Sequence, residues 1–109
     1  MTSRNGGEVT VSCFARTGEG WTTRVFAPGL GVPEDAATGS AAGPLAVHLA
    51  RHGRISFGQE VTIRQGAEIG RPSTLFARAD GSGQSIERVA VGGSAVIVAE
   101  GEFRLPTPD

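Results

Sequence analysis

One segment of the chain has a helical hydrophobic period, and it is apolar around most of its circumference. In Ser40–His52 (SAAGPLAVHLARH), Leu45 and Leu49 recur four residues apart, and alanines fill the positions around them. Pro44 stands in the first turn, where a missing N–H costs little, and Gly53 supplies a C-terminal stop. A helix without a broad polar face is stable only when neighbouring elements surround it. We therefore predict a central helix that the rest of the chain encloses.

Short strand-like runs precede and follow this helix, and turns rich in glycine separate them. Glu8–Arg16 alternates apolar with polar residues and is expected to form a hairpin with Trp21–Ala27. The residues of the first run expected to face the core are Val9, Val11, Cys13 and Ala15. Further strand candidates are 60–65, 73–79, 85–91 and 94–100, the last continued by 102–105. The pattern predicts an α+β domain, with a mixed, mostly antiparallel sheet wrapped around one central apolar helix.

A chain of 109 residues has room for one domain. We expect a disordered start over 1–7, a single domain over 8–105 and a tail over 106–109. The net charge is -1, and the ten basic residues, all arginine, are scattered along the chain, which argues against a nucleic-acid partner. No apolar run approaches the roughly 18 residues of a membrane span, and the first seven residues do not resemble a secretory signal. We expect no membrane association.

Cys13 is the single cysteine, so the chain has neither an intrachain disulfide nor a cysteine-rich zinc site. A lone thiol suits the reducing cytoplasm, where we expect the protein to reside. His48 and His52 are four residues apart on the helix, but no third ligand is nearby, so a polar stripe is favoured over a metal site. Trp21 is expected to cover an edge or an interface. Arg71 either pairs with an acid or stabilises a turn.

The loop before the helix concentrates the residues that carry chemistry. Glu34 and Asp35 are adjacent carboxylates, and Thr38-Gly39-Ser40 forms the mouth of the helix. The first N–H groups of a helix have no intrahelical partner and carry partial positive charge, so a mouth that opens with Gly and Ser suits a substrate carboxylate. The alternative is ordinary capping, with Asp35 closing a turn and Thr38 or Ser40 at the N-cap.

The segment GVPEDAATGSAAGPLAVHLARHG resembles the signature of the phenazine-biosynthesis isomerase-like (PhzF) family, within the diaminopimelate epimerase-like superfamily. Three further motifs agree in order, namely Arg24-Val25-Phe26-Ala27-Pro28, then Gln65-Gly66 with Gly70-Arg71-Pro72-Ser73, then Val91-Gly92-Gly93. The resemblance implies half of an epimerase-like fold, with Asp35 and Ser40 lining an active cleft. It also implies that Thr38 and the Gly39 and Ser40 amides bind a substrate carboxylate, while Asp35 hydrogen-bonds the substrate or a histidine. Ala36 replaces the family's proline, which loosens the loop.

The resemblance covers a second domain, and nothing in this chain matches the first. In the family, a proton-shuttling glutamate and a histidine come from that first domain, so we expect this chain to bind rather than catalyse on its own. One hypothesis is the C-terminal half of a cofactor-independent isomerase or epimerase, completed by an N-terminal half chain. The other is a non-catalytic homo-oligomeric module, in which a second copy faces the first and each binds a small carboxylate-bearing molecule. A degenerate fragment with a role in assembly alone is a third.

Overall fold

One curled sheet surrounds one helix in the computed structural model, which describes residues 1–5 and 8–108. The strands of the described part are β1 (Thr2–Asn5), β2 (Glu8–Thr17), β3 (Gly20–Ala27), β4 (Val32–Asp35), β5 (Val61–Gln65), β6 (Ser73–Gly81) and β7 (Ile86–Gly93). The helix α1 spans Gly39–Arg51, and short 3-10 turns cover Pro28–Leu30 and Ala67–Ile69.

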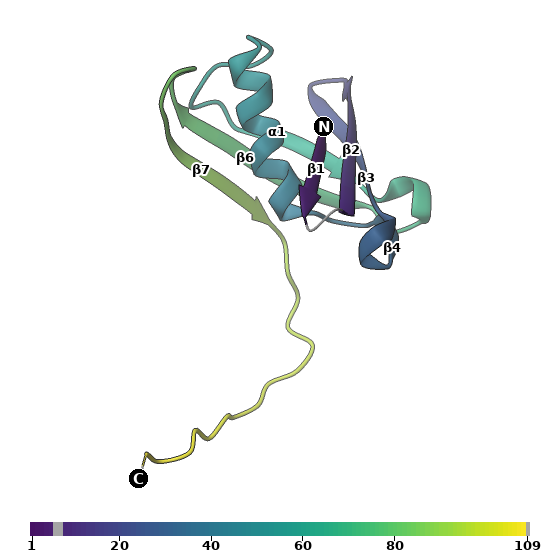
Figure 1. Cartoon of the computed structure of the whole chain (residues 1–109), viewed down its shortest axis with the longest axis vertical. Coiled ribbons are helices and arrows are strands. Elements are labelled where there is room, and N and C mark those ends of the chain that lie inside the picture. The colour runs from purple at the N-terminus through teal and green to yellow at the C-terminus, as the bar shows by residue number, and fades with distance from the viewer. Residues whose placement is uncertain (6–7, 109) are drawn as a thin grey trace.

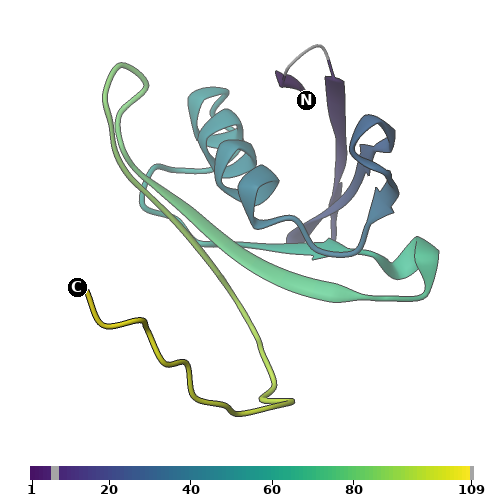
Figure 2. The same cartoon turned by 60° about the horizontal axis from the view of Figure 1, so that its bottom comes forward.

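The strands follow the order β1-β2-β3-β5-β6-β7, and β4 pairs with β3 beside this path. The pair β3/β5 is parallel, because α1 crosses over between them, and the other pairs are antiparallel. Figures 1 and 2 show α1 lying inside the curve of the sheet. The predicted α+β fold, with a mixed sheet around a central helix, is confirmed.

The core lies between α1 and the concave face of the sheet. Leu45 and Leu49 are completely buried, and Ile63 of β5 is 1% exposed. Burying each leucine side chain contributes about 2 kcal/mol. Trp21 is only 5% exposed and belongs to this core, with its ring centroid 6.1 Å from that of Phe14. The expectation that Trp21 covers an edge or an interface is therefore wrong.

The face of β2 that turns toward the core is the opposite of the one predicted. Ser12 is buried and Phe14 packs against the core, whereas Cys13 is exposed. The register with β3 explains this, because Cys13 lies opposite Arg24 and shares its outward face. Since strand side chains alternate in direction, an error of one residue in the register moves every inward-facing side chain to the outer face.

The two ends of the chain also differ from expectation. The start predicted to be disordered contains β1, which pairs with β2, while Gly6 and Gly7 lie outside the described residues. The strand expected at 94–100 is absent from the described residues, and 94–108 has no regular structure. This stretch extends away from the sheet (Figures 1 and 2), and the radius of gyration is 16.7 Å, compared with about 13 Å for a compact chain of this length. Asp109 lies outside the described residues.

Candidate binding site at the helix N-terminus

Helix α1 begins with two backbone donors open to solvent. Thr38 occupies the N-cap position in an extended conformation, and its carbonyl accepts hydrogen bonds from the amides of Ala41 (3.2 Å) and Ala42 (3.1 Å). Gly39 and Ser40 are exposed, and their amides have no acceptor among residues 1–5 and 8–108. Two N–H groups therefore remain free at the positive end of the helix dipole.

A hollow of about 180 Å³ adjoins this helix start. Its walls come from the first residue of the chain, from β2, and from the N-cap and first two turns of α1, and they consist of Met1, Thr10, Ser12, Thr38, Ser40, Ala41 and Pro44. Ser12 is 6% exposed, and its Oγ has no hydrogen-bond partner within the described part of the chain. A buried hydroxyl without a hydrogen-bond partner lowers the stability of a fold by roughly 1–3 kcal/mol, unless a bound molecule supplies the partner. The hollow is smaller than the roughly 300–1,000 Å³ of a complete ligand pocket, so it has the size of part of a site.

The topology brings Asp35, Thr38 and Gln65 together at one edge of β3. In β3, Val25 pairs with Asp35 at the end of β4 and Thr23 pairs with Gln65 at the end of β5. Gln65 Nε2 donates to the Asp35 carbonyl (2.8 Å) and to the Thr38 hydroxyl (2.9 Å), and its Oε1 accepts from the Thr38 amide (3.2 Å). Gln65 thus joins the loop before the helix to the sheet.

The Thr38 hydroxyl donates to Asp35 Oδ2 at 2.5 Å and makes no capping bond to the helix. Thr38 is thus the N-cap residue, as the capping alternative has it, but its side chain does not cap the helix. Asp35 is half-buried, and its second oxygen, Oδ1, has no hydrogen-bond partner among the described residues. Asp35 does not line the hollow but is connected to it through Thr38. The arrangement holds the Asp35 carboxylate in one orientation and leaves one of its oxygens available as an acceptor.

The neighbouring carboxylate, Glu34, is engaged elsewhere. Arg24 donates from Nη2 to Glu34 Oε1 at 2.7 Å and from Nε to Glu34 Oε2 at 3.2 Å. The hydrogen bond from Arg24 holds the pKa of Glu34 below its ordinary value and raises the pKa of Arg24. The Arg24 guanidinium also lies 5.2 Å from the centre of the Phe26 ring. These contacts fasten β4 to β3, so Glu34 has a structural task.

Gln65 is the site residue that reasoning from residue chemistry missed, although the Gln65-Gly66 motif was noted. Gly66 follows it with a φ of 88°, and a Cβ at Gly66 would lie 2.8 Å from the Ala36 carbonyl oxygen. The glycine thereby allows the end of β5 to approach the loop that carries Asp35. Arg71 donates its backbone amide to the Gly66 carbonyl at 2.9 Å, which supports the turn role for this segment.

His48, in the last turn of α1, and His52, its C-cap residue, lie side by side with their rings tilted by 50°. The ring centroids of His48 and His52 are 4.4 Å apart, and the Phe14 ring meets His48 edge-on at 5.5 Å. Burial, followed by the charge of His52, lowers the pKa of His48. Within the described ranges, no group of three or more His, Cys, Asp or Glu side chains is placed to hold a metal ion.

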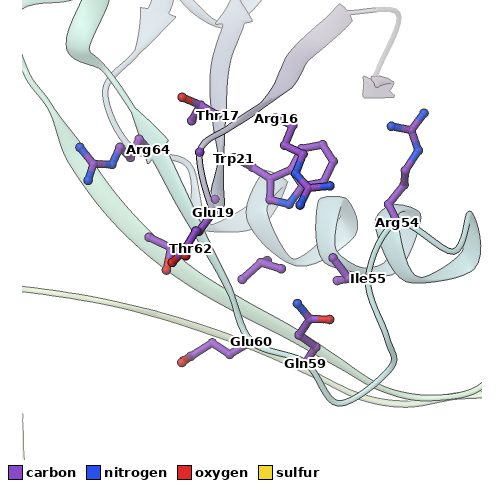
Figure 3. Close-up of a pocket in the computed structure, with 13 residues that line it drawn as sticks. Arg16, Thr17, Glu19, Trp21, Arg54, Ile55, Gln59, Glu60, Thr62 and Arg64 are labelled. Atoms are coloured by element: carbon purple, nitrogen blue, oxygen red, sulfur yellow. The ribbon is translucent and has the colours of Figure 1, made fainter.

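A larger hollow, of about 540 Å³, lies at the β2–β3 turn, and none of the predicted site residues line it (Figure 3). Arg16, Arg54 and Arg64 line it together with Glu19 and Glu60. Figure 3 shows Arg64 extending to the opposite side from Arg54. Because this open hollow is lined by both acidic and basic side chains, it lacks the charge of one sign that would select one class of ligand.

The fold, one helix inside a curled mixed sheet, is half of an epimerase-like α+β fold. The family of phenazine biosynthesis-like proteins (PhzC-PhzF) matches residues 2–101, and the chain belongs to this family. In the described part of the chain, no helix has the length and apolar character that a bilayer crossing requires.

Curated relatives agree with this assignment. The chain is 56% identical over 98 residues to a trans-2,3-dihydro-3-hydroxyanthranilate isomerase of Pseudomonas chlororaphis, a match that covers 90% of this chain and 35% of the relative. The enzyme of the same name from Pseudomonas aeruginosa is 55% identical with the same coverage. An uncharacterized isomerase of Deinococcus radiodurans is 39% identical over 103 residues, covering 91% of this chain and 33% of the relative. The chain thus spans about a third of the length of the relatives it matches.

Proposed function

We propose that this chain is the carboxylate-binding half of a phenazine-biosynthesis-like isomerase. The observation that carries the proposal is the hollow of about 180 Å³ at the start of α1, which is lined by Ser40, whose amide is unpaired, and by Ser12, whose buried hydroxyl has no partner in the described residues. The unpaired amide of Gly39 directly precedes Ser40. A carboxylate placed there accepts hydrogen bonds from Gly39 and Ser40 and neutralises the end of the helix dipole. The hydroxyl of Ser40 adds a donor that rotates to suit the ligand.

The ligand chemistry and the names of two relatives, both trans-2,3-dihydro-3-hydroxyanthranilate isomerases, support an anthranilate-type substrate. An anthranilate-type substrate carries a carboxylate and an amine on neighbouring ring atoms. With the carboxylate at the helix mouth, Asp35 Oδ1 is a suitable acceptor for the amine or for a histidine of the missing half. The Thr38 and Gln65 hydrogen bonds hold Asp35 in place, so it acts as an orienting group.

Isomerisation requires a proton to leave one carbon and another to reach a second carbon. The group that performs this transfer must lie within hydrogen-bond reach of the substrate. The family resemblance assigns it to a glutamate that this chain lacks, so a partner region supplies the acid–base chemistry. We assign binding and orientation to Asp35, Thr38, Gly39 and Ser40, and we expect the reaction only in the completed protein.

Binding is tested by titrating the isotope-labelled chain with anthranilate and recording the amide resonances of Gly39 and Ser40. Anthranilamide, which is neutral and of nearly the same shape, is the control ligand. We expect both resonances to shift with anthranilate and to stay in place with anthranilamide. Equal responses to the two ligands would show that the site does not select a carboxylate.

A matched pair of variants isolates the backbone donor. Gly39→Pro removes the amide at the first helical position, which proline tolerates, and Thr38 before it is already extended. Gly39→Ala keeps the amide, and the added Cβ lies 3.8 Å from Val91 Cγ1, an ordinary contact. We expect the proline variant to bind anthranilate about tenfold more weakly, since a charged hydrogen bond contributes about 1.5–3 kcal/mol. Unchanged binding in the proline variant would refute the role of this amide.

Catalysis is tested by combining the chain with the complementary region of the Pseudomonas chlororaphis relative and following solvent deuterium incorporation into the relative's substrate. We expect incorporation with both parts present and none with this chain alone. A stable complex without incorporation would contradict the isomerase assignment. A symmetric dimer of this chain that binds anthranilate in the same hollow and catalyses nothing would support the binding-module hypothesis instead.

A further inference from the structure

Ser12 differs from the other buried polar side chains in the described part of the chain, which are Thr23 and Gln65. Thr23 Oγ1 donates to Gln65 Oε1 at 3.5 Å, and Gln65 also bonds Asp35 and Thr38. Ser12 is 6% exposed, and its Oγ has no hydrogen-bond partner among the residues that the structure describes. Buried polar groups are nearly always hydrogen-bonded, so this hydroxyl indicates a partner from outside these residues.

The backbone of Ser12 holds its side chain in one direction. Its amide donates to the Met1 carbonyl at 2.7 Å, and its carbonyl accepts from the Met1 nitrogen at 2.6 Å. Side chains alternate along a strand, and Cys13 is exposed on the outer face of β2. The Ser12 hydroxyl therefore lies on the inner face, where it lines the hollow at the start of α1. The backbone groups of Ser12 are paired, whereas its hydroxyl is not.

Two walls of the hollow carry polar groups of different kinds. The wall from α1 offers the unpaired amide and the hydroxyl of Ser40, while the wall from β2 offers the hydroxyls of Thr10 and Ser12. The next inward residue of β2, Phe14, packs against the hydrophobic core. A ligand whose carboxylate binds at Ser40 therefore has a second polar wall beside it, and this wall ends at the apolar core.

A buried hydroxyl favours a neutral hydrogen-bonding group, because it both donates and accepts and carries no charge. A ligand that enters the hollow displaces solvent from Ser12. An apolar substituent then leaves the Ser12 hydroxyl unpaired, whereas a hydroxyl substituent supplies the missing hydrogen bond. We propose that Ser12 is a specificity-determining residue that hydrogen-bonds a hydroxyl group on the ring of the carboxylate ligand. It thereby selects hydroxylated ring carboxylates over those that lack the hydroxyl.

This inference rests on the proposed function, which places the ligand carboxylate at Gly39 and Ser40. The amine of an anthranilate-type ligand is directed to Asp35, so the group that faces Ser12 is a further substituent of the ring. The helix mouth holds the carboxylate and Ser12 recognises the ring substituent. Because the two contacts involve different parts of the ligand, ligands that differ in one group separate them.

The test titrates the isotope-labelled full chain with 3-hydroxyanthranilate, 4-hydroxyanthranilate and 5-hydroxyanthranilate. Each is compared with the anthranilate that carries a methyl group at the same position, which has nearly the same shape. We expect the hydroxyl compound to bind roughly tenfold more tightly than its methyl counterpart at one ring position. The Cβ resonance of Ser12 should shift with that compound and not with its methyl counterpart. The absence of a hydroxyl preference at every position would overturn the proposal.

Ser12→Ala removes the hydroxyl and adds no bulk, so we expect the preference for the hydroxyl ligand to disappear in this variant. Thr10→Val is the matched control, because it removes a hydroxyl from the same wall and keeps the shape of the side chain. Thr10 is only half-buried, so solvent reaches it, and its variant should keep the preference. A preference that survives in Ser12→Ala, or that is lost equally in Thr10→Val, would overturn the assignment to Ser12.

The stability of the free chain distinguishes ligand recognition from a structural role. Because Ser12→Ala removes a buried hydroxyl that has no partner, its urea midpoint should equal or exceed that of the original chain. A clearly lower midpoint would show that the hydroxyl bonds within the fold and would overturn the proposal. Equal responses to anthranilate and anthranilamide would overturn the proposed function together with this inference. Carboxylate-selective binding without a hydroxyl preference would overturn the role of Ser12 alone.

Discussion

Gln65 and Thr38 exchange hydrogen bonds in both directions. The Gln65 side-chain amide donates to the Thr38 hydroxyl at 2.9 Å, and the Thr38 backbone amide donates to Gln65 Oε1 at 3.2 Å. Gln65 ends β5 and is 3% exposed, whereas Thr38 directly precedes α1. The position of the helix mouth is therefore fixed by a glutamine from the sheet rather than by a cap within the helix. The Gly39 and Ser40 amides have no acceptor in the described part of the chain.

Replacing Gln65 with alanine should destabilise the protein. The Thr38 amide and the Asp35 carbonyl lose their partner in a partly buried setting, and unsatisfied groups of this kind cost about 1–3 kcal/mol each. We expect a loss of roughly 3 kcal/mol in the free energy of unfolding, measured by urea denaturation. Gln84→Ala, at an exposed position in the β6–β7 turn, is the control and should change stability by less than about 0.5 kcal/mol. Equal effects would contradict the importance of the Gln65 hydrogen bonds.

Two glycines with the same backbone conformation but different surroundings give a second prediction. Gly66 has a φ of 88°, and a Cβ there would lie 2.2 Å from the Arg71 carbonyl oxygen, while Gly70 has a φ of 71° and open space around it. We expect Gly70→Ala to cost about 1 kcal/mol from the left-handed conformation alone. Gly66→Ala should lower the free energy of unfolding clearly more, because the backbone at Arg71 must also move to make room for the Cβ. Similar unfolding midpoints for the two variants would show that the turn relaxes freely.

The sequence was sufficient to predict the helix and most of the sheet. α1 is long, and its leucines are spaced for one buried face, so the prediction differed from Gly39–Arg51 by one residue at each end. The hairpin β2–β3 and the strands β5 to β7 were also predicted, because alternating residues and turn glycines mark them. The local sequence pattern predicts a helix or strand well when that element buries one regular face.

The predictions failed where residues far apart in the sequence determine the structure. The face of β2 depends on its register with β3, which sequence alternation in β2 alone does not reveal. The Asp35–Thr38–Gln65 network joins residues 27 and 30 positions apart, so spacing along the chain gave no sign of it. The predicted strand over 94–100 has strand composition without a partner in the described part of the chain.

The outward orientation of Cys13 leads to a chemical prediction. Its thiol is exposed on the outer face of β2, opposite Arg24 of the neighbouring strand β3. We expect it to react completely with a maleimide or a disulfide reagent in the folded protein, without denaturant, in contrast to the buried position that strand alternation predicted. The measurement is mass spectrometry of the labelled chain, with the Cys13→Ser variant as the blank. Labelling that requires urea would show that β2 faces the other way.

The lowered pKa of His48 makes stability depend on pH in one direction. Burial, and then the charge of His52, lowers the pKa of His48 from its ordinary value of 6.5, with smaller contributions from the Met1 ammonium group and Arg54. The unfolded chain therefore binds more protons than the folded chain just below pH 6.5, so the free energy of unfolding should rise with pH through that window and fall on acidification. Urea midpoints measured from about pH 5 to pH 7.5 test this.

His48→Gln removes the titrating group, so we expect a flatter pH dependence whatever its effect on stability at neutral pH. His52→Gln is the matched control, since it leaves His48 half-buried beside Phe14 and removes only the charge of His52, the smaller cause of the lowered pKa. It should keep most of the slope. The comparison uses the difference between midpoints at the two ends of the pH range, so a general loss of packing cancels. A slope that survives in His48→Gln, or stability that increases on acidification, would assign the pH dependence to other groups.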